Sequence, residues 1–139
     1  MRMTHAEEAL SVLVVEDNDD TAQSTASLLS LYGYAARVAD CGDEALRLAA
    51  IDPPDVVLLD LRMPGMTGWE VAERLRTLDV GKPPLVVAIS GCDRDEDRRR
   101  STRAGIDLHL VKPVEPAVLI GLLKRFGRAV GRPRPVVMP

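Results

Sequence analysis

Residues 55–68, with the sequence DVVLLDLRMPGMTG, constrain the fold more than any other part of the chain. Residues 56–59 form an unbroken apolar run, which is typical of a strand buried on both faces of a parallel sheet. Pro64 and Gly65 then exclude further strand. Asp60 lies between the run and the turn, so we expect a buried strand that ends in a carboxylate and leads into a loop.

A helix is expected directly after this loop. Thr67 and Glu70 have the T-x-x-E spacing of a capping box, in which each side chain bonds to the backbone of the other residue. Val71 and Leu75 recur at helical spacing and provide a buried stripe. Trp69, in the first turn, is expected to pack only partly. The predicted unit is strand, acidic loop and helix.

Four further strands are predicted from short runs of apolar or alternating residues. They lie at residues 12–15, 34–38, 85–89 and 108–111. Helical segments separate them, and Asp19 or Asp20 is expected to cap the first helix. This alternation is typical of the α/β class. Because crossovers are right-handed, we expect a doubly wound, flavodoxin-like sheet of five parallel strands in the order 2-1-3-4-5, with helices on both faces.

The chain fits one domain with short extensions. Its 139 residues are 46 % hydrophobic, which suits a single core better than two. We expect a flexible lead-in at residues 1–10, the domain at residues 11–126, and a loose tail rich in Gly, Arg and Pro at residues 127–139.

Two of the predicted helices differ in their apolar content. The helix at residues 93–104 has almost no apolar stripe beyond Ala104 and should be weakly anchored, with Arg98 to Arg100 and Arg103 on a solvated face. The last helix, residues 116–126, carries a band wider than one core stripe needs. That band comprises Val118, Leu119, Ile120, Leu122 and Leu123.

Composition excludes several function classes. A net charge of -3 and 3 % aromatic residues give no reason to expect a nucleic-acid partner. No apolar run is long enough to cross a bilayer, and the N-terminus lacks a secretory signal pattern. Cys41 and Cys92 lack the spacing of a metal or redox motif. We therefore expect a reduced, cytoplasmic chain without a membrane partner.

In the predicted order, four strands end at one rim of the sheet. The polar side chains at these ends are Glu16, Asp17, Asp60, Ser90 and Lys112. Clustered carboxylates repel one another, and a hard cation among them relieves that repulsion. Mg²⁺ suits the set: Asp17 and Asp60 can offer carboxylates, Arg62 its backbone carbonyl, and Glu16 a contact through water.

The remaining groups at the rim suit phosphoryl transfer. Lys112 offers a compact positive charge and Ser90 a hydroxyl donor. Together with the carboxylates and Mg²⁺, they match a highly charged phosphoryl group transferred to Asp60 as nucleophile.

The chain also resembles the receiver domain of two-component response regulators, over roughly residues 11–126. The resemblance rests on VVEDN at 14–18, LLDLRMPGMTG at 58–68, ISG at 89–91 and VKP at 111–113. It implies that Asp60 accepts phosphate from a histidine kinase or phosphotransfer protein, and that Glu16 and Asp17 form the acidic pair. It further implies that Ser90 is the switch hydroxyl and Lys112 the lysine that pairs with phosphate. Position 109, usually aromatic in this family, is His109 here and takes the second switch position.

The resemblance implies a signalling domain rather than an enzyme, limited to its own phosphorylation and dephosphorylation. We expect a downstream protein, or a second copy, on the face formed by residues 93–104, the strand 108–111 and the last helix. Arg62 and Cys92 are expected to tune the lifetime of the phosphoryl group. One alternative is a degenerate receiver that acts as a phosphorylation-independent interaction module. A Mg²⁺-dependent phosphatase of the haloacid dehalogenase class is less well supported, because it needs a second Asp where Arg62 stands.

Overall fold

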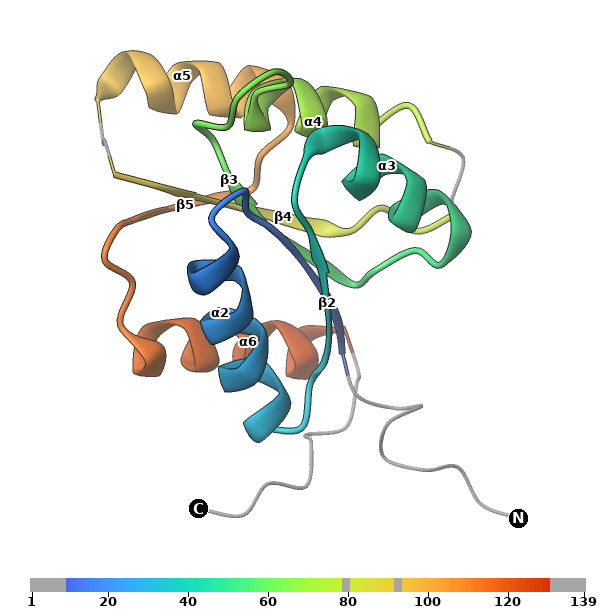
Figure 1. Cartoon of the computed structure of the whole chain (residues 1–139), viewed down its shortest axis with the longest axis vertical. Helices are drawn as coiled ribbons and strands as arrows, with labels where there is room; N and C mark the ends of the chain where they lie inside the picture. Colours follow the sequence, from blue (N-terminus) through green and yellow to red (C-terminus); the bar gives the residue numbers. More distant parts are fainter. Residues whose placement is uncertain (1–9, 79–80, 92–93, 131–139) are drawn as a thin grey trace.

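A five-stranded parallel sheet forms the centre of the molecule (Figure 1). The computed structural model describes residues 10–78, 81–91 and 94–130. The strands run in the order β2-β1-β3-β4-β5, as predicted, and every neighbouring pair is parallel. Their bounds are β1 Ser11–Val15, β2 Ala35–Ala39, β3 Val56–Asp60, β4 Leu85–Ser90 and β5 Leu108–Val111.

Helices cover both faces of this sheet. Their bounds are α2 Asp19–Leu31, α3 Gly42–Ile51, α4 Gly68–Leu75, α5 Asp95–Ala104 and α6 Pro116–Ala129. Figure 1 shows α3, α4 and α5 on one face, with α2 and α6 on the other. The predicted doubly wound, flavodoxin-like architecture is therefore confirmed. Within the described ranges, no helix combines the length and the apolar character that crossing a bilayer requires.

The sheet separates two apolar cores. Successive residues of a strand point to opposite faces, so neighbours in β3 belong to different cores. Leu59 packs in the core that contains Trp69 of α4, whereas Leu58 packs in the core that contains Leu119 of α6. Every residue of β3 is buried, Asp60 included. The run of apolar residues in the sequence thus reflects a strand that is covered on both sides.

The cap of α2 corrects a prediction. Asn18, rather than Asp19 or Asp20, is the capping residue: its side-chain oxygen accepts a hydrogen bond from the Thr21 N–H at 2.9 Å. Asp19 and Asp20 follow it in the first turn of the helix. Negative charge is favourable there because the helix dipole is positive at that end.

The predicted capping box of α4 is confirmed. The Glu70 N–H donates to Thr67 Oγ1 at 3.3 Å, and the Thr67 N–H donates to Glu70 Oε1 at 2.9 Å. The first residue of the helix, Gly68, lies so close to the backbone of Asp60 and Leu61 that a Cβ atom would clash with both. The first turn of α4 is therefore packed directly against the end of β3.

The last helix corrects two expectations. It continues past Phe126 to Ala129, because Gly127 is buried near Leu10 and packing outweighs the low helix propensity of glycine. The predicted apolar band is also mostly internal: Ile120 is buried and Leu122 packs against the core, while Val118 is 52 % exposed. The predicted lead-in, except Leu10, and the tail from residue 131 onward lie outside the described residues.

Candidate functional site

The carboxyl ends of four strands meet at one edge of the sheet, as predicted. In the strand register, Leu59 lies opposite Val15, so Asp60 and Glu16 follow at neighbouring positions. Asp60 lies opposite Ile89 on the other side, and Ser90 lies opposite Val111. The residues at the carboxyl ends of β1, β3, β4 and β5 are thereby brought to a common rim.

Three carboxylates gather at this rim. Glu16, Asp17 and Asp60 each place one oxygen within 4.8 Å of the others. Glu16 and Asp60 are buried, each 7 % exposed, whereas Asp17 is exposed. A set of closely spaced oxygen donors fits a hard cation such as Mg²⁺, which prefers carboxylates, carbonyls and water. The donor set therefore agrees with the predicted metal.

The electrostatics of Glu16 point the same way. Burial raises the pKa of the Glu16 carboxyl above its ordinary value, and the neighbouring charge of Asp60 raises it further. A hydrogen bond from the Asn18 N–H at 3.1 Å and the charge of Lys112 act in the opposite direction. Burial and the Asp60 charge prevail, so a cation between the carboxylates would relieve a real repulsion.

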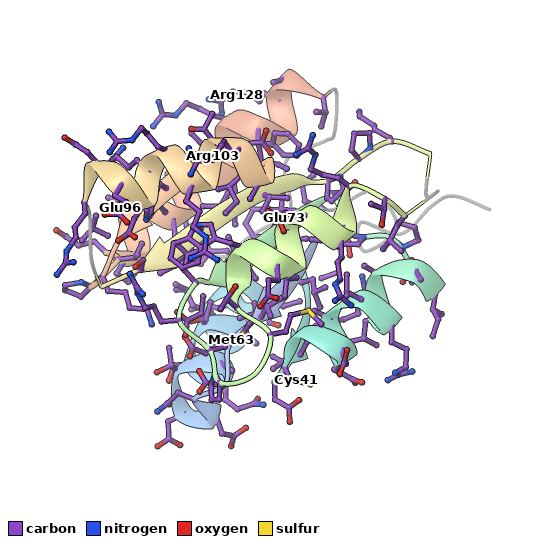
Figure 2. All side chains as sticks on the ribbon, turned by 90° about the horizontal axis from the view of Figure 1, so that it is seen from above. Cys41, Met63, Glu73, Glu96, Arg103 and Arg128 are labelled. Carbon is purple, nitrogen blue, oxygen red and sulfur yellow. The ribbon has the colours of Figure 1, made fainter. Side chains whose placement is uncertain are left out.

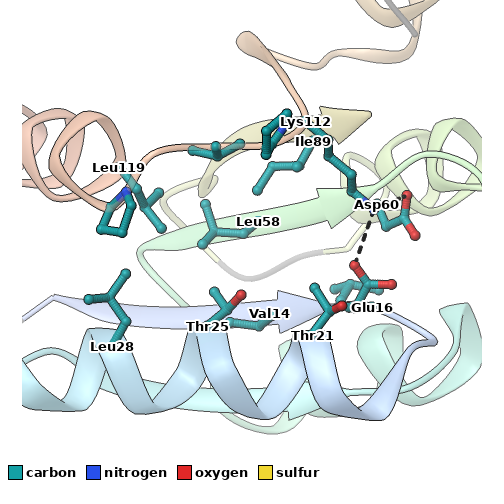
Figure 3. A pocket seen from close by; sticks show the side chains of 14 residues that line it. Val14, Glu16, Thr21, Thr25, Leu28, Leu58, Asp60, Ile89, Lys112 and Leu119 are labelled. Atoms are coloured by element: carbon teal, nitrogen blue, oxygen red, sulfur yellow. Dashed lines mark hydrogen bonds and ion pairs between the residues drawn. The ribbon is translucent and has the colours of Figure 1, made fainter. Parts of the chain in front are cut away.

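Lys112 joins the carboxylates from the end of β5. Its Nζ lies 3.5 Å from Glu16 Oε1 and 3.7 Å from Asp60 Oδ1. Figure 3 shows the three side chains directed toward one another at one end of a pocket. The Lys112 N–H also donates to the Ser90 carbonyl at 2.7 Å, which ties the lysine to β4. A positive charge is thus held within reach of any anionic group on Asp60.

A cavity of about 330 Å³ opens beside Asp60, between α2 and the segment that joins β5 to α6. Val14, Leu58 and Leu119 line its apolar part, and Lys112 lies at the end near the carboxylates (Figure 3). The Asp60 carboxylate is therefore buried at the end of its strand yet borders an open space.

The two predicted switch residues occupy different places. Ser90 is buried at the end of β4, at the rim. His109 lies on β5 opposite Ala88 and is half-buried. It lines a groove of about 240 Å³ together with residues of α5, including Arg98 and Ser101. Cys92, the other residue predicted to tune phosphoryl lifetime, lies outside the described residues.

Sequence reasoning missed a polar cluster between the site loop and α5. Arg62 Nη2 forms an ion pair with Asp97 Oδ2 at 3.2 Å, and Trp69 Nε1 donates to Ser101 Oγ at 3.0 Å. The Arg100 guanidinium lies 4.2 Å from the centroid of the Trp69 ring. Figure 2 shows α5 beside α4, with Glu96 and Arg103 labelled on α5 and Glu73 on α4.

This cluster corrects the expectation that Trp69 packs only partly, because Trp69 is 2 % exposed. The predicted solvated face of α5 is confirmed, because Arg98 to Arg100 and Arg103 are exposed, and Arg100 in addition lies against the ring. The missed signal was a stripe at helical spacing made of Asp97, Ser101 and Ala104, all buried. A search for apolar periodicity overlooks such a stripe because two of its members are polar.

Comparison with known proteins identifies the family. The response regulator receiver domain model matches residues 12–124. The chain is 38 % identical over 120 residues to the transcriptional regulatory protein PrrA of Mycobacterium tuberculosis, a match that covers 86 % of this chain and 51 % of PrrA. The chain thus spans about half the length of that regulator.

Solved structures agree. Chemotaxis protein CheY4 of Vibrio cholerae superposes with a TM-score of 0.80 at 30 % identity, covering 84 % of this chain and 98 % of CheY4. The receiver domain of the sensor histidine kinase PA1611 from Pseudomonas aeruginosa superposes with a TM-score of 0.76 at 27 % identity, covering 84 % and 96 % of the two chains. That structure has a magnesium ion coordinated in its active site cleft. By family model, sequence and fold, the chain belongs to the response regulator receiver domains of two-component signalling.

Proposed function

We propose that this receiver takes a phosphoryl group onto Asp60 from a histidine kinase or phosphotransfer protein and thereby changes an interaction face. The observation that carries the proposal is the approach of Lys112 Nζ to within 3.7 Å of Asp60 Oδ1, beside the carboxylates of Glu16 and Asp17. This arrangement supplies a nucleophile, a cation for the incoming phosphate and a set of oxygen donors.

The residues that would hold Mg²⁺ are Asp17, Asp60 and the backbone carbonyl of Arg62, with Glu16 contributing through water. The bound ion would neutralise charge on the transferred group. In the transfer, an ionised oxygen of Asp60 forms the new bond to phosphorus as the bond from phosphorus to the imidazole nitrogen of the donor breaks. Lys112 gives up its contacts with the carboxylates of Glu16 and Asp60 and pairs instead with a phosphoryl oxygen, because the phosphoryl group carries more negative charge.

The conformational response would pass through Ser90 and His109. We infer that the Ser90 hydroxyl donates to a phosphoryl oxygen, which draws the start of the following loop inward and shifts α5. His109 lines the groove beneath α5 and would follow that shift.

Replacing His109 with Ala should leave phosphate uptake intact while weakening the phosphorylation-dependent gain in partner binding. An undiminished gain would exclude His109 from the switch.

The proposed output face consists of α5, β5 and α6. Three large apolar side chains are exposed along β5 and α6: Leu108 and Val111 at 40 % each, and Val118 at 52 %. Exposed apolar side chains on these elements favour contact with a downstream protein or a second copy. A charged residue at Val118 that leaves both partner binding and self-association intact would exclude this face.

The cytoplasmic location stays a prediction from the sequence, which cell fractionation would test.

The direct test is the intact mass of the chain after incubation with a small phosphodonor and Mg²⁺. The wild type should gain the mass of one phosphoryl group, and Asp60→Asn should gain none. Asp43→Asn, at an exposed position on α3, is the matched control and should behave as wild type. Full uptake by Asp60→Asn would refute the assignment of the acceptor. No uptake by the wild type, from small donors and kinases alike, would favour the phosphorylation-independent interaction module.

A further inference from the structure

Arg62 contacts both the acceptor and α5. Its backbone N–H donates to Asp60 Oδ1 at 3.3 Å. Its side-chain Nη2 donates to both carboxylate oxygens of Asp97, at 3.3 and 3.2 Å. Asp60 and Asp97 are buried, 7 % and 8 % exposed, although the Arg62 side chain itself is mostly exposed. One residue therefore joins the site through its main chain and the helix through its side chain.

The position of α5 depends on contacts of this kind. Of its three buried residues, Asp97 and Ser101 are polar and only Ala104 is apolar. A buried carboxylate needs a cation or donors to compensate its charge, and Arg62 supplies the cation for Asp97. Ser101 is held by Trp69, and the Arg62 guanidinium carbon lies 5.2 Å from the centroid of the same ring. The two buried polar residues of α5 therefore converge on Arg62 and Trp69, whereas the end of the helix is held separately by the packing of Ala104 and by Arg76, whose Nη1 donates to the Arg103 carbonyl at 3.0 Å.

We propose that Arg62 is a positioning residue that couples metal and phosphoryl binding at Asp60 to the position of α5. The inference rests on the proposed function, in which the Arg62 carbonyl is a Mg²⁺ ligand. The metal and Asp97 would then hold the same residue at two points. A residue fixed at one point has less freedom to lose at the other, so each contact strengthens the other. This coupling is reciprocal: Mg²⁺ steadies α5, and the ion pair raises the affinity for Mg²⁺.

The first arm of the test needs no metal. Hydrogen exchange of the α5 amides is measured in the full chain for Arg62→Gln, Asp97→Asn and the double variant. Each single change should speed exchange by about fivefold, the upper end for a partly exposed ion pair, and the double variant should exchange no faster than either. Arg99→Gln and Glu96→Gln, at exposed positions on the same helix, are the matched controls and should match wild type. Additive effects in the double variant would show that Arg62 and Asp97 do not act through their ion pair, and would refute the proposal.

The second arm measures coupling. Trp69 is the single tryptophan of the chain, so its fluorescence can follow a Mg²⁺ titration. Asp97→Asn should lower the Mg²⁺ affinity by about fivefold, and Mg²⁺ should slow α5 exchange in wild type but not in this variant. A wild-type Mg²⁺ affinity in Asp97→Asn, together with normal phosphate uptake at Asp60, would refute the coupling and leave the proposed function intact. If the wild type binds no Mg²⁺ and takes up no phosphate, both proposals fail, and the ion pair is purely structural.

Discussion

Helices α5 and α6 follow each other along the chain, on opposite faces of the sheet, yet they are held in place by different forces. The buried side chains of α6 include Leu119, Ile120 and Leu123, whereas α5 buries Asp97, Ser101 and Ala104. Apolar burial is non-directional and changes gradually when a helix shifts. Hydrogen bonds, including the one between Trp69 and Ser101, weaken steeply when their geometry is lost. We therefore expect α6 to belong to the fixed scaffold and α5 to be the helix that moves in the proposed switch.

The largest expected effect lies in α6. Leu123 is fully buried, so Leu123→Ala should leave a cavity and lower the free energy of unfolding by about 2–5 kcal/mol. Val118→Ala, at an exposed position on the same helix, should change it by less than about 0.5 kcal/mol. Chemical denaturation of both variants measures the difference. Equal losses in the two variants would contradict the role of α6 as an apolar scaffold.

A smaller and more local effect is expected in α5. Ser101→Ala removes the acceptor of the buried Trp69 Nε1–H, which should cost about 1–3 kcal/mol. The loss should appear as faster hydrogen exchange in α5 with little change in α6. Ser27→Ala, at an exposed position on α2, is the control. Equal acceleration of exchange in both helices would show that α5 is not an independent unit.

The site at the rim should respond to pH in a way that involves neither helix. Because burial and the charge of Asp60 raise the pKa of Glu16, the folded chain binds this proton more tightly than the unfolded chain does. The stabilisation that this proton provides is complete below pH 4.5, the ordinary pKa of a glutamate carboxyl. It is lost as the pH rises through the raised pKa of Glu16. Without metal, Glu16→Gln should therefore be more stable than wild type at neutral pH and equal to it in acid.

Mg²⁺ should reverse that ranking at neutral pH, since only the wild type keeps the full set of carboxylates. Thermal unfolding with a chelator and then with added Mg²⁺ tests both statements. A wild type that is more stable than Glu16→Gln in the chelator would mean that Glu16 is compensated by the protein alone.

The smallest expected effect concerns salt. The Arg62–Asp97 pair is partly exposed, with 58 % of the arginine side chain accessible, so added salt should screen it. Exchange in α5 should rise by an amount equivalent to less than about 1 kcal/mol, and α6 should not respond. Hydrogen exchange at low and high NaCl measures this directly. A response of equal size in α6 would mean that α5 is not held by polar contacts to a greater extent than α6 is.

Much of the fold and of the candidate site followed from local sequence patterns. The apolar run before Asp60 predicted a doubly covered strand, and the T-x-x-E spacing of Thr67 and Glu70 predicted the start of α4. The rim followed from the fold class, because parallel strands with right-handed connections bring their carboxyl ends to one edge. Glu16, Asp60 and Lys112 therefore lie together, as predicted from strand ends alone.

The anchoring of α5 could not be predicted in this way. Arg62 and Asp97 are 35 positions apart, and Trp69 and Ser101 are 32 apart. No local period relates such pairs, and polar residues on a helix are ordinarily solvated, so the helical spacing of Asp97, Ser101 and Ala104 did not by itself predict burial. Whether a carboxylate can be buried depends on a partner supplied by another element. The sequence by itself determined the strands, through patterns within each segment, and their order and the rim that carries Asp60, through the fold class that those strands define. Only the tertiary structure decided how α5 is held, because that depends on side chains which meet only after the sheet has assembled.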